Sequence, residues 1–143
     1  MIVYFDTSAL VATYVDHTCT KQARAAKRSA RVATSVLTYA ETLGTLGTLT
    51  RARALTRRAA AKVESEFLAE WTDIQRIKLD DRLLPDVRRI VKFHSLKGAD
   101  AVQLASACLV ARGCANAGVA CQFACDDHDL VRAAAAEGLV LAW

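Results

Sequence analysis

The sequence contains no apolar run that approaches the ~20 residues required for a membrane-spanning helix. Its first residues, MIVYFDTSAL, also lack the basic segment that opens a secretory signal peptide, and an aspartate interrupts the apolar residues at position 6. We therefore expect this stretch to form a buried strand, and we expect a cytoplasmic protein with no membrane partner.

Cysteine occurs in an odd number and without the paired spacing of zinc-binding or disulfide-rich modules. The five cysteines are Cys19, Cys108, Cys114, Cys121 and Cys125, and no two of them form a CxxC motif. We expect buried, reduced thiols rather than a disulfide framework or a zinc knuckle.

The chain has 143 residues, of which 53% are hydrophobic and 24% charged, and it shows no repeat, linker or low-complexity tract. This composition predicts one folded domain over residues 1–143. The formal net charge is +4, from 19 basic and 15 acidic residues. If four acids gather in one pocket, the remaining surface has 19 basic residues against 11 acidic ones, which suits a polyanionic partner such as nucleic acid.

Short apolar runs alternate with helical patterns along the whole chain. The expected strands cover residues 2–5, 31–35, 74–79, 118–124 and 139–143. The expected helices cover residues 18–29, 35–52, 54–72, 80–95 and 130–138, together with one that starts at residues 6–8 and one that runs from Gly98 to a C-cap at Gly113. This order predicts an α/β sandwich around a mainly parallel sheet.

Acidic residues fall where ligands bind in such sheets, beyond the carboxyl ends of the strands. They are Asp6, Glu41, Asp100 and the group Asp126, Asp127 and Asp129. Each has a structural alternative, since Asp6 and one of the last three suit helix caps, Glu41 suits a solvated helix face, and Asp100 suits the positive end of a helix dipole. Their joint placement nevertheless predicts one shared acidic pocket.

Four stretches carry a resemblance to a known family. YFDTSAL at the start, TYAE at 38–41, LKGADAVQLA at 96–105 and CDDHDLVRAA at 125–134 resemble the PIN-domain ribonucleases, and among these the VapC-type toxins of toxin–antitoxin pairs. The resemblance implies a three-layer α/β/α sandwich with an acidic pocket. It also implies metal-dependent cleavage of RNA.

By this resemblance Asp6, Glu41 and Asp100 match three catalytic acids of the family, and Asp127 matches the fourth, with Asp126 as the alternative. Asp6 and Asp100 are the expected direct ligands of Mg²⁺, or of Mn²⁺, while the number of ions stays open. Two further residues mark the pattern. Ser8 matches a hydroxyl residue beside the first acid, whereas Cys125 stands where the family usually has a small hydroxyl residue.

The implied reaction is hydrolysis of RNA phosphodiester bonds by metal-activated water, with tRNA or another structured RNA as substrate. Phosphate contacts are expected from two basic clusters: Arg51, Arg53, Arg57 and Arg58, and Arg82, Arg88, Arg89 and Lys92. Tyr14, Tyr39 and Trp71 are candidates for base stacking, with core packing as the alternative. The implied partners are a cognate antitoxin and a second copy of the chain, in a homodimer or a toxin–antitoxin hetero-oligomer, with the apolar helix at 35–50 as a candidate surface.

A second interpretation comes from a different functional class. A PIN-like domain that has lost catalysis would only bind RNA or protein, and Cys125 favours this alternative whereas the four acids oppose it. Other acidic-pocket folds fit less well. A dehalogenase-type phosphatase needs an aspartate where Ser8 stands, and a receiver domain needs a late lysine, but no lysine follows Lys97.

Overall fold

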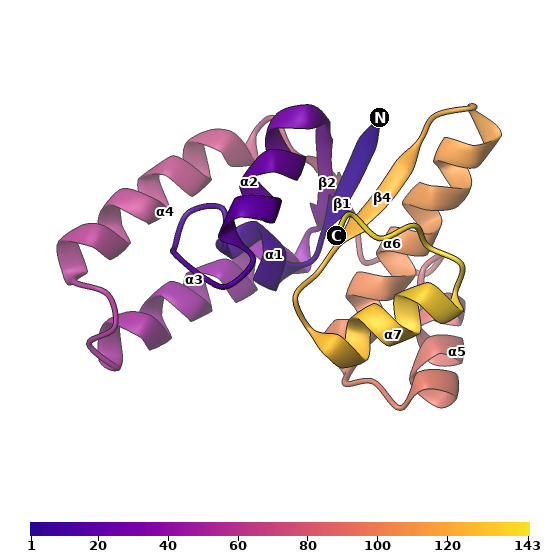
Figure 1. Cartoon of the computed structure of the whole chain (residues 1–143). Helices are drawn as coiled ribbons and strands as arrows, with labels where there is room; N and C mark the ends of the chain where they lie inside the picture. Colours follow the sequence, from indigo (N-terminus) through magenta and orange to yellow (C-terminus); the bar gives the residue numbers. More distant parts are fainter.

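Four short strands form one parallel sheet in the computed structural model, which describes residues 1–143 (Figure 1). The strands are β1 (Ile2–Phe5), β2 (Arg31–Ser35), β3 (Gln75–Ile77) and β4 (Cys121–Ala124), in the spatial order β3-β2-β1-β4. In the central strand, Tyr4 lies opposite Ala33 on one side and Phe123 on the other. The direction of strand progression therefore reverses at β1, and the loops after β1 and β4 leave a ligand-binding position between them.

Helices cover both faces of this sheet (Figure 1). On one side lie α1 (Thr7–Val11), α2 (Thr20–Ser29), α3 (Leu37–Arg51) and α4 (Arg57–Trp71). On the other side lie α5 (Leu84–His94), α6 (Gly98–Asn116) and α7 (His128–Ala136). The predicted three-layer α/β/α sandwich with a parallel sheet is confirmed.

The central strand divides its side chains between two hydrophobic cores. Val3 and Phe5 belong to the core that contains Phe67 of α4, whereas Tyr4 belongs to the core that contains Leu104 of α6. Ten of the 19 residues of α6 are buried, because this helix packs against the sheet on one side and α5 and α7 on the others. This explains why its sequence is apolar nearly all the way round.

Three predictions for the chain after residue 112 are wrong. Residues 139–143 form no strand: Leu141 makes only an isolated bridge to Phe123. Gly113 does not end its helix, which continues to Asn116 because Cys114 still packs in the core. The left-handed residue is Gly118, with φ of 63°, and β4 consequently starts at Cys121 rather than at residue 118.

The helix predicted at 80–95 starts later than expected, at Leu84. The Asp80 carboxylate accepts a hydrogen bond from the Arg82 backbone N–H (3.1 Å), which stabilises a turn ahead of the helix. Pro85 then lies in the first helical turn, where its missing N–H costs little. The strand predicted at 74–79 is limited to Gln75–Ile77. No helix has both the length and the apolar character needed to cross a membrane.

Candidate active site

A cleft of about 460 Å³ opens at the carboxyl ends of β1 and β4. All four predicted acids line it: Asp6, Glu41, Asp100 and Asp127. Asp126, the alternative to Asp127, does not line the cleft and instead pairs with His17 (Oδ2 to Nδ1, 3.0 Å). No lysine or arginine lines the cleft, and none of the four acids forms an ion pair with a basic side chain.

Asp6 is the N-cap of α1 and also lines the cleft. Its Oδ1 accepts a hydrogen bond from the Ala9 N–H (2.9 Å), and its Oδ2 accepts one from the Ser8 N–H (3.2 Å). The Ser8 hydroxyl also donates to this carboxylate, at 2.9 Å. Asp6 is only 6% exposed, and burial raises its pKa from the usual 3.8 to about 6, although these hydrogen bonds oppose the rise.

Glu41 is positioned by a buried glutamine that the sequence analysis missed. Gln103, on α6, is 2% exposed, and its Nε2 lies 2.9 Å from Glu41 Oε2 and 2.9 Å from Thr38 Oγ1. The Tyr4 hydroxyl donates to Gln103 Oε1 (2.8 Å), which orients the amide nitrogen toward Glu41. Thr7 also donates its hydroxyl proton to Glu41. The only sequence signal for Gln103 was its position, as a polar residue one turn after Asp100 in a largely apolar stretch of the helix.

Two threonines connect this network to the backbone of the central strand. Thr34 Oγ1 donates to the carbonyl oxygen of Phe5 (2.7 Å) and lies 2.7 Å from Thr38 Oγ1. Both threonines are fully buried. The end of β1, the start of α3 and the middle of α6 are therefore held together by polar contacts beneath the cleft, and such a satisfied network gives a single well-defined arrangement.

Asp100 and Asp127 face each other across the other half of the cleft. Burial, and then the negative charges of Asp127 and Glu41, raise the pKa of Asp100, while the positive charge of Lys97 partly opposes this. No side chain or backbone group of the protein donates a hydrogen bond to the Asp100 carboxylate. Asp127 caps α7, because its Oδ1 accepts hydrogen bonds from the N–H groups of Asp129 and Leu130 (2.9 Å each).

Cys125 contributes a thiol to the loop that carries Asp127. Its Sγ lies 3.3 Å from the Asp127 N–H, which it accepts as a hydrogen bond. Burial raises the pKa of this thiol far above its usual range, so the group is neutral. The residue that replaces the family's usual hydroxyl therefore supports the backbone of Asp127 without adding negative charge.

The donor set of the cleft fits a hard divalent cation. The four acids Asp6, Glu41, Asp100 and Asp127 offer carboxylate oxygens, and the cleft is lined in addition by Asp16 and by the imidazole of His17. Mg²⁺ and Mn²⁺ prefer oxygen ligands of this kind. A cation would also relieve the repulsion that raises the pKa of Asp100.

The three candidate stacking residues pack against aromatic side chains of the protein. Tyr14 and Tyr39 each contact Phe67, with ring centroids 6.1 and 6.0 Å apart, and Trp71 lies 5.4 Å from Tyr39. The Tyr14 hydroxyl donates to Glu70. These rings accordingly join the turn after α1, and α3, to α4, as the packing alternative proposed, although Tyr39 remains 38% exposed.

Comparisons with known proteins agree on one family. The family model described as "PIN domain" matches residues 3–135. Two curated relatives from Mycobacterium tuberculosis, Ribonuclease VapC45 (strain CDC 1551 / Oshkosh) and Ribonuclease VapC49 (strain ATCC 25618 / H37Rv), are each 32% identical over 110 residues, which cover 76% of this chain and 76% of the relative.

Solved structures share the fold at lower sequence identity. A toxin–antitoxin complex from Klebsiella pneumoniae contains a chain that is 15% identical, with a TM-score of 0.65 and coverage of 99% of this chain and 98% of that one. VapC20 of M. tuberculosis, described as a sarcin–ricin loop cleaving toxin, is 21% identical, with a TM-score of 0.61 and coverage of 92% and 94%. VapBC2 from Rickettsia felis, bound to a promoter DNA fragment, is 13% identical, with a TM-score of 0.61 and coverage of 99% and 97%.

Proposed function

Because the chain belongs to the PIN-domain family and is homologous to VapC ribonucleases, we propose that it is a metal-dependent endoribonuclease and the toxin of a toxin–antitoxin pair. One observation carries the proposal. Four carboxylates from four separated segments line one cleft that contains no lysine or arginine. Such a cleft attracts divalent cations and repels a phosphodiester unless a cation is bound there.

In this proposal Asp6 and Asp100 are the direct ligands of Mg²⁺ or Mn²⁺. A divalent cation in this position supplies a Lewis acid for the phosphate and lowers the pKa of a bound water. Glu41 and Asp127 hold and orient water at the remaining positions. The buried hydrogen-bond network supports these assignments, because it fixes Asp6 through Ser8 and Ala9, and Glu41 through Gln103.

The protein's own groups must also position the RNA strand. A second cleft, of about 570 Å³, shares Asp100 and Asp127 with the first and is lined further by Phe93, Lys97 and Arg132. Asp100 and Asp127 therefore lie where the two clefts meet, as expected for a site within a longer strand. We infer that a phosphate adjacent to the scissile one contacts Lys97, whose positive charge acts on Asp100.

Of the two basic clusters, the one at the α3–α4 turn is the better candidate for phosphate contacts. Arg51, Arg53 and Arg57 line a shallow surface there and form no ion pair. In the second cluster Arg82 pairs with Asp80 (2.7 Å) and Arg89 pairs with Glu137 (2.6 Å). Paired guanidinium groups have less charge to offer a polyanion.

We propose a structured RNA with an exposed loop, such as a tRNA, as the substrate. Sequence-specific RNA recognition generally targets unpaired loops, whose bases are accessible. The structural relative VapC20 is described as cleaving the sarcin–ricin loop, which is consistent with this substrate class. A cognate antitoxin is the expected partner, since two of the structural relatives are toxin–antitoxin complexes. Homodimerisation and a cytoplasmic location remain part of the proposal.

The decisive experiment measures cleavage of total RNA by the purified protein with Mg²⁺, with Mn²⁺ and with EDTA. We expect cleavage only with a divalent cation, and we expect Asp100→Asn to abolish it while leaving the circular dichroism spectrum unchanged. Asp73→Asn removes an exposed acid outside the cleft and is the matched control. Cleavage that survives in EDTA, or in Asp100→Asn, contradicts the proposal.

Sequencing of RNA 5′ ends after controlled expression then identifies the substrate. The Asp100→Asn protein serves as the background, because it retains the RNA-binding surface. Ends that accumulate with the wild-type chain alone mark the cleavage sites. If wild type and variant bind RNA equally and neither cleaves it, the chain is the inactive binding module described above.

A further inference from the structure

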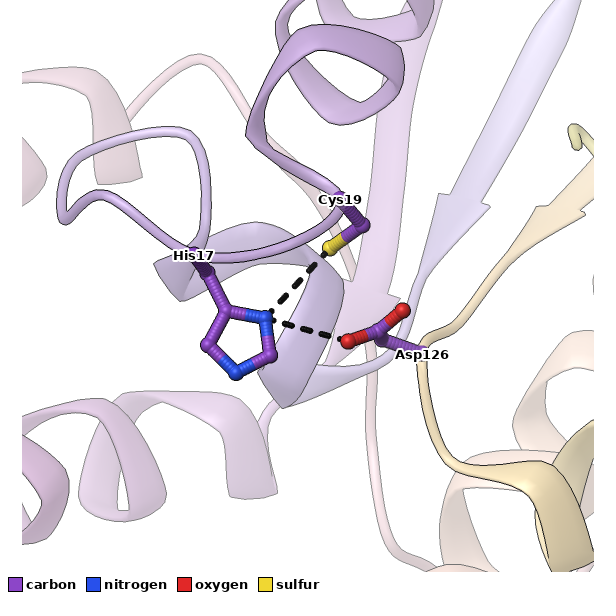
Figure 2. A group of neighbouring side chains, drawn as sticks. All are labelled: His17, Cys19 and Asp126. Atoms are coloured by element: carbon purple, nitrogen blue, oxygen red, sulfur yellow. Dashed lines mark hydrogen bonds and ion pairs between the residues drawn. The ribbon is translucent and has the colours of Figure 1, made fainter.

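A cluster of three side chains that can ligate a metal lies at the edge of the cleft, to which only His17 of the three contributes (Figure 2). His17 and Cys19 belong to the turn between α1 and α2, and Asp126 follows β4. His17 Nδ1 lies 3.0 Å from Asp126 Oδ2 and 3.9 Å from Cys19 Sγ. All three donor atoms lie within 4.8 Å of one another. Figure 2 shows the imidazole, thiol and carboxylate converging from two segments distant in sequence.

An ion pair beside a buried cysteine would explain part of this geometry. His17 and Asp126 form such a pair, and Cys19 is only 3% exposed, as expected for a small apolar residue. The thiol sulfur also lies within hydrogen-bonding distance of the imidazole nitrogen, so Cys19 faces the ion pair rather than apolar atoms alone. The Asp126 carboxylate is held in addition by the Thr18 hydroxyl, which donates to the same Oδ2 at 3.0 Å.

The distances agree with those between ligands of one tetrahedral ion. Zn²⁺ binds nitrogen and oxygen at about 2.0–2.2 Å and sulfur at about 2.3 Å, so two ligand atoms of one ion lie about 3.4–3.6 Å apart. The observed separations of 3.0 and 3.9 Å bracket that value. The third separation, between Cys19 Sγ and Asp126 Oδ2, is at most 4.8 Å, so small rotations of these side chains would place all three atoms around a single ion.

We propose that His17, Cys19 and Asp126 bind a borderline-soft divalent ion of the Zn²⁺ class through Nδ1, Sγ and Oδ2, with water as the fourth ligand. The donor set is nitrogen, sulfur and oxygen, whereas the four acids of the neighbouring cleft offer oxygen alone. Ligand softness therefore assigns the two positions to different metals. This proposal departs from the expectation of inert thiols for Cys19, and it does not depend on nuclease activity.

The bound ion would link two loops that also carry residues of the acidic cleft. The Asp126 N–H lies 3.4 Å from the Ser8 hydroxyl, which in turn donates to Asp6. Asp127, the next residue after Asp126, lines the cleft. Occupancy of the cluster would accordingly hold the α1–α2 turn and the β4–α7 loop in a fixed relation, and it would raise the midpoint of thermal unfolding.

Cobalt(II) is the probe, because a thiolate ligand gives it a charge-transfer band in the near ultraviolet and tetrahedral coordination gives strong visible bands. The purified, reduced chain should show both at one equivalent of Co²⁺, and Zn²⁺ should abolish them by displacement. Cys19→Ser should lose the charge-transfer band. His17→Gln and Asp126→Asn, whose side chains are more exposed and safer for folding, should weaken Co²⁺ binding by more than about tenfold.

Two control variants separate this cluster from other metal sites. Cys121 interacts with Cys114, and these two thiols are the alternative source of a thiolate ligand. Cys121→Ser should therefore leave the spectrum unchanged. Asp100→Asn disables the acidic cleft and should also leave it unchanged, so failure of the nuclease proposal would not affect this result. A band that persists in Cys19→Ser, or one that disappears in Cys121→Ser, overturns the assignment, as does a wild-type spectrum without tetrahedral bands.

Discussion

Replacing the buried acid Asp6 by asparagine should stabilise the metal-free protein at neutral pH. Burial raises the pKa of Asp6 from 3.8 to about 6, so the ionised carboxylate costs the folded state up to about 3 kcal/mol, at ~1.4 kcal/mol per pKa unit. Asparagine is uncharged and is as good an N-cap as aspartate, because its amide oxygen keeps the bond from the Ala9 N–H. Its amide nitrogen replaces Oδ2 and cannot accept the longer 3.2 Å bond from the Ser8 N–H, but it can donate to the Ser8 hydroxyl. We expect the free energy of unfolding to rise by about 1–3 kcal/mol.

The sign of the pH dependence follows from the direction of the shift. Between about pH 4 and pH 6 the folded protein keeps a proton on Asp6 that the unfolded chain has lost. The stability of the wild type therefore falls as pH rises through this interval, whereas Asp6→Asn lacks this contribution. The two proteins should differ least below about pH 4 and most above about pH 6. Mg²⁺ should reduce the difference, because it stabilises only the wild-type carboxylate.

Urea unfolding followed by circular dichroism, at a series of pH values with EDTA or with Mg²⁺, measures this effect. Asp73→Asn is the matched control, since that residue is exposed and its replacement should change stability by less than about 0.5 kcal/mol. The reasoning fails if Asp6→Asn is destabilised at neutral pH, or if its difference from the wild type is the same at pH 4 and pH 7. Either result would mean that burial does not disfavour the charged form of Asp6.

Three further substitutions test the site and its support. Glu41→Gln should lower single-turnover RNA cleavage by about a hundredfold or more without altering the near-ultraviolet circular dichroism, and near-normal cleavage would remove Glu41 from the mechanism. Gln103→Met should cost about 1–3 kcal/mol in urea unfolding, because the buried Tyr4 hydroxyl loses its acceptor, and it should lower kcat more than it changes KM. Glu137→Gln tests a contact outside the site: the Arg89 guanidinium lowers the pKa of Glu137 to about 2, so this contribution is present above about pH 4.5 and is lost as pH falls toward 2. The substitution should therefore reduce stability by about 1–2 kcal/mol at neutral pH and leave it unchanged near pH 2, as measured by thermal unfolding.

The sequence was sufficient to predict the fold because the strands of a parallel sheet are buried on both faces. IVYF and RVATS are short runs of apolar and small residues between helical patterns, and this alternation determined the layer order. The last expected strand, LVLAW, has the same composition, but only Leu141 pairs with the sheet. The composition of this segment is compatible with a strand. Whether its backbone pairs with β4 depends on the path that the chain takes after α7.

The positions of the acids were predictable because each follows a strand end, opens a helix or, for Glu41, lies one turn into the helix after β2. Their supporting contacts were not, since they depend on which helices face one another across the sheet. Gln103 reaches Glu41 on α3, 62 residues away, and Tyr4 on β1, 99 residues away. Such pairs leave no periodic signal in a single sequence, because each residue is separately compatible with a buried helix or strand.

The adjacent residues Asp126 and Asp127 illustrate how one sequence motif serves two sites. Asp127 is held by the first N–H groups of α7, and its extended backbone (φ −87°, ψ 119°) places it on the cleft side of the loop. Successive side chains of an extended segment point in opposite directions, so Asp126 must turn away from the cleft, toward His17 and Thr18. The cap thus determines which aspartate joins the other three acids of the cleft, and it leaves the neighbouring Asp126 to pair with the His17 imidazole beside the Cys19 thiol.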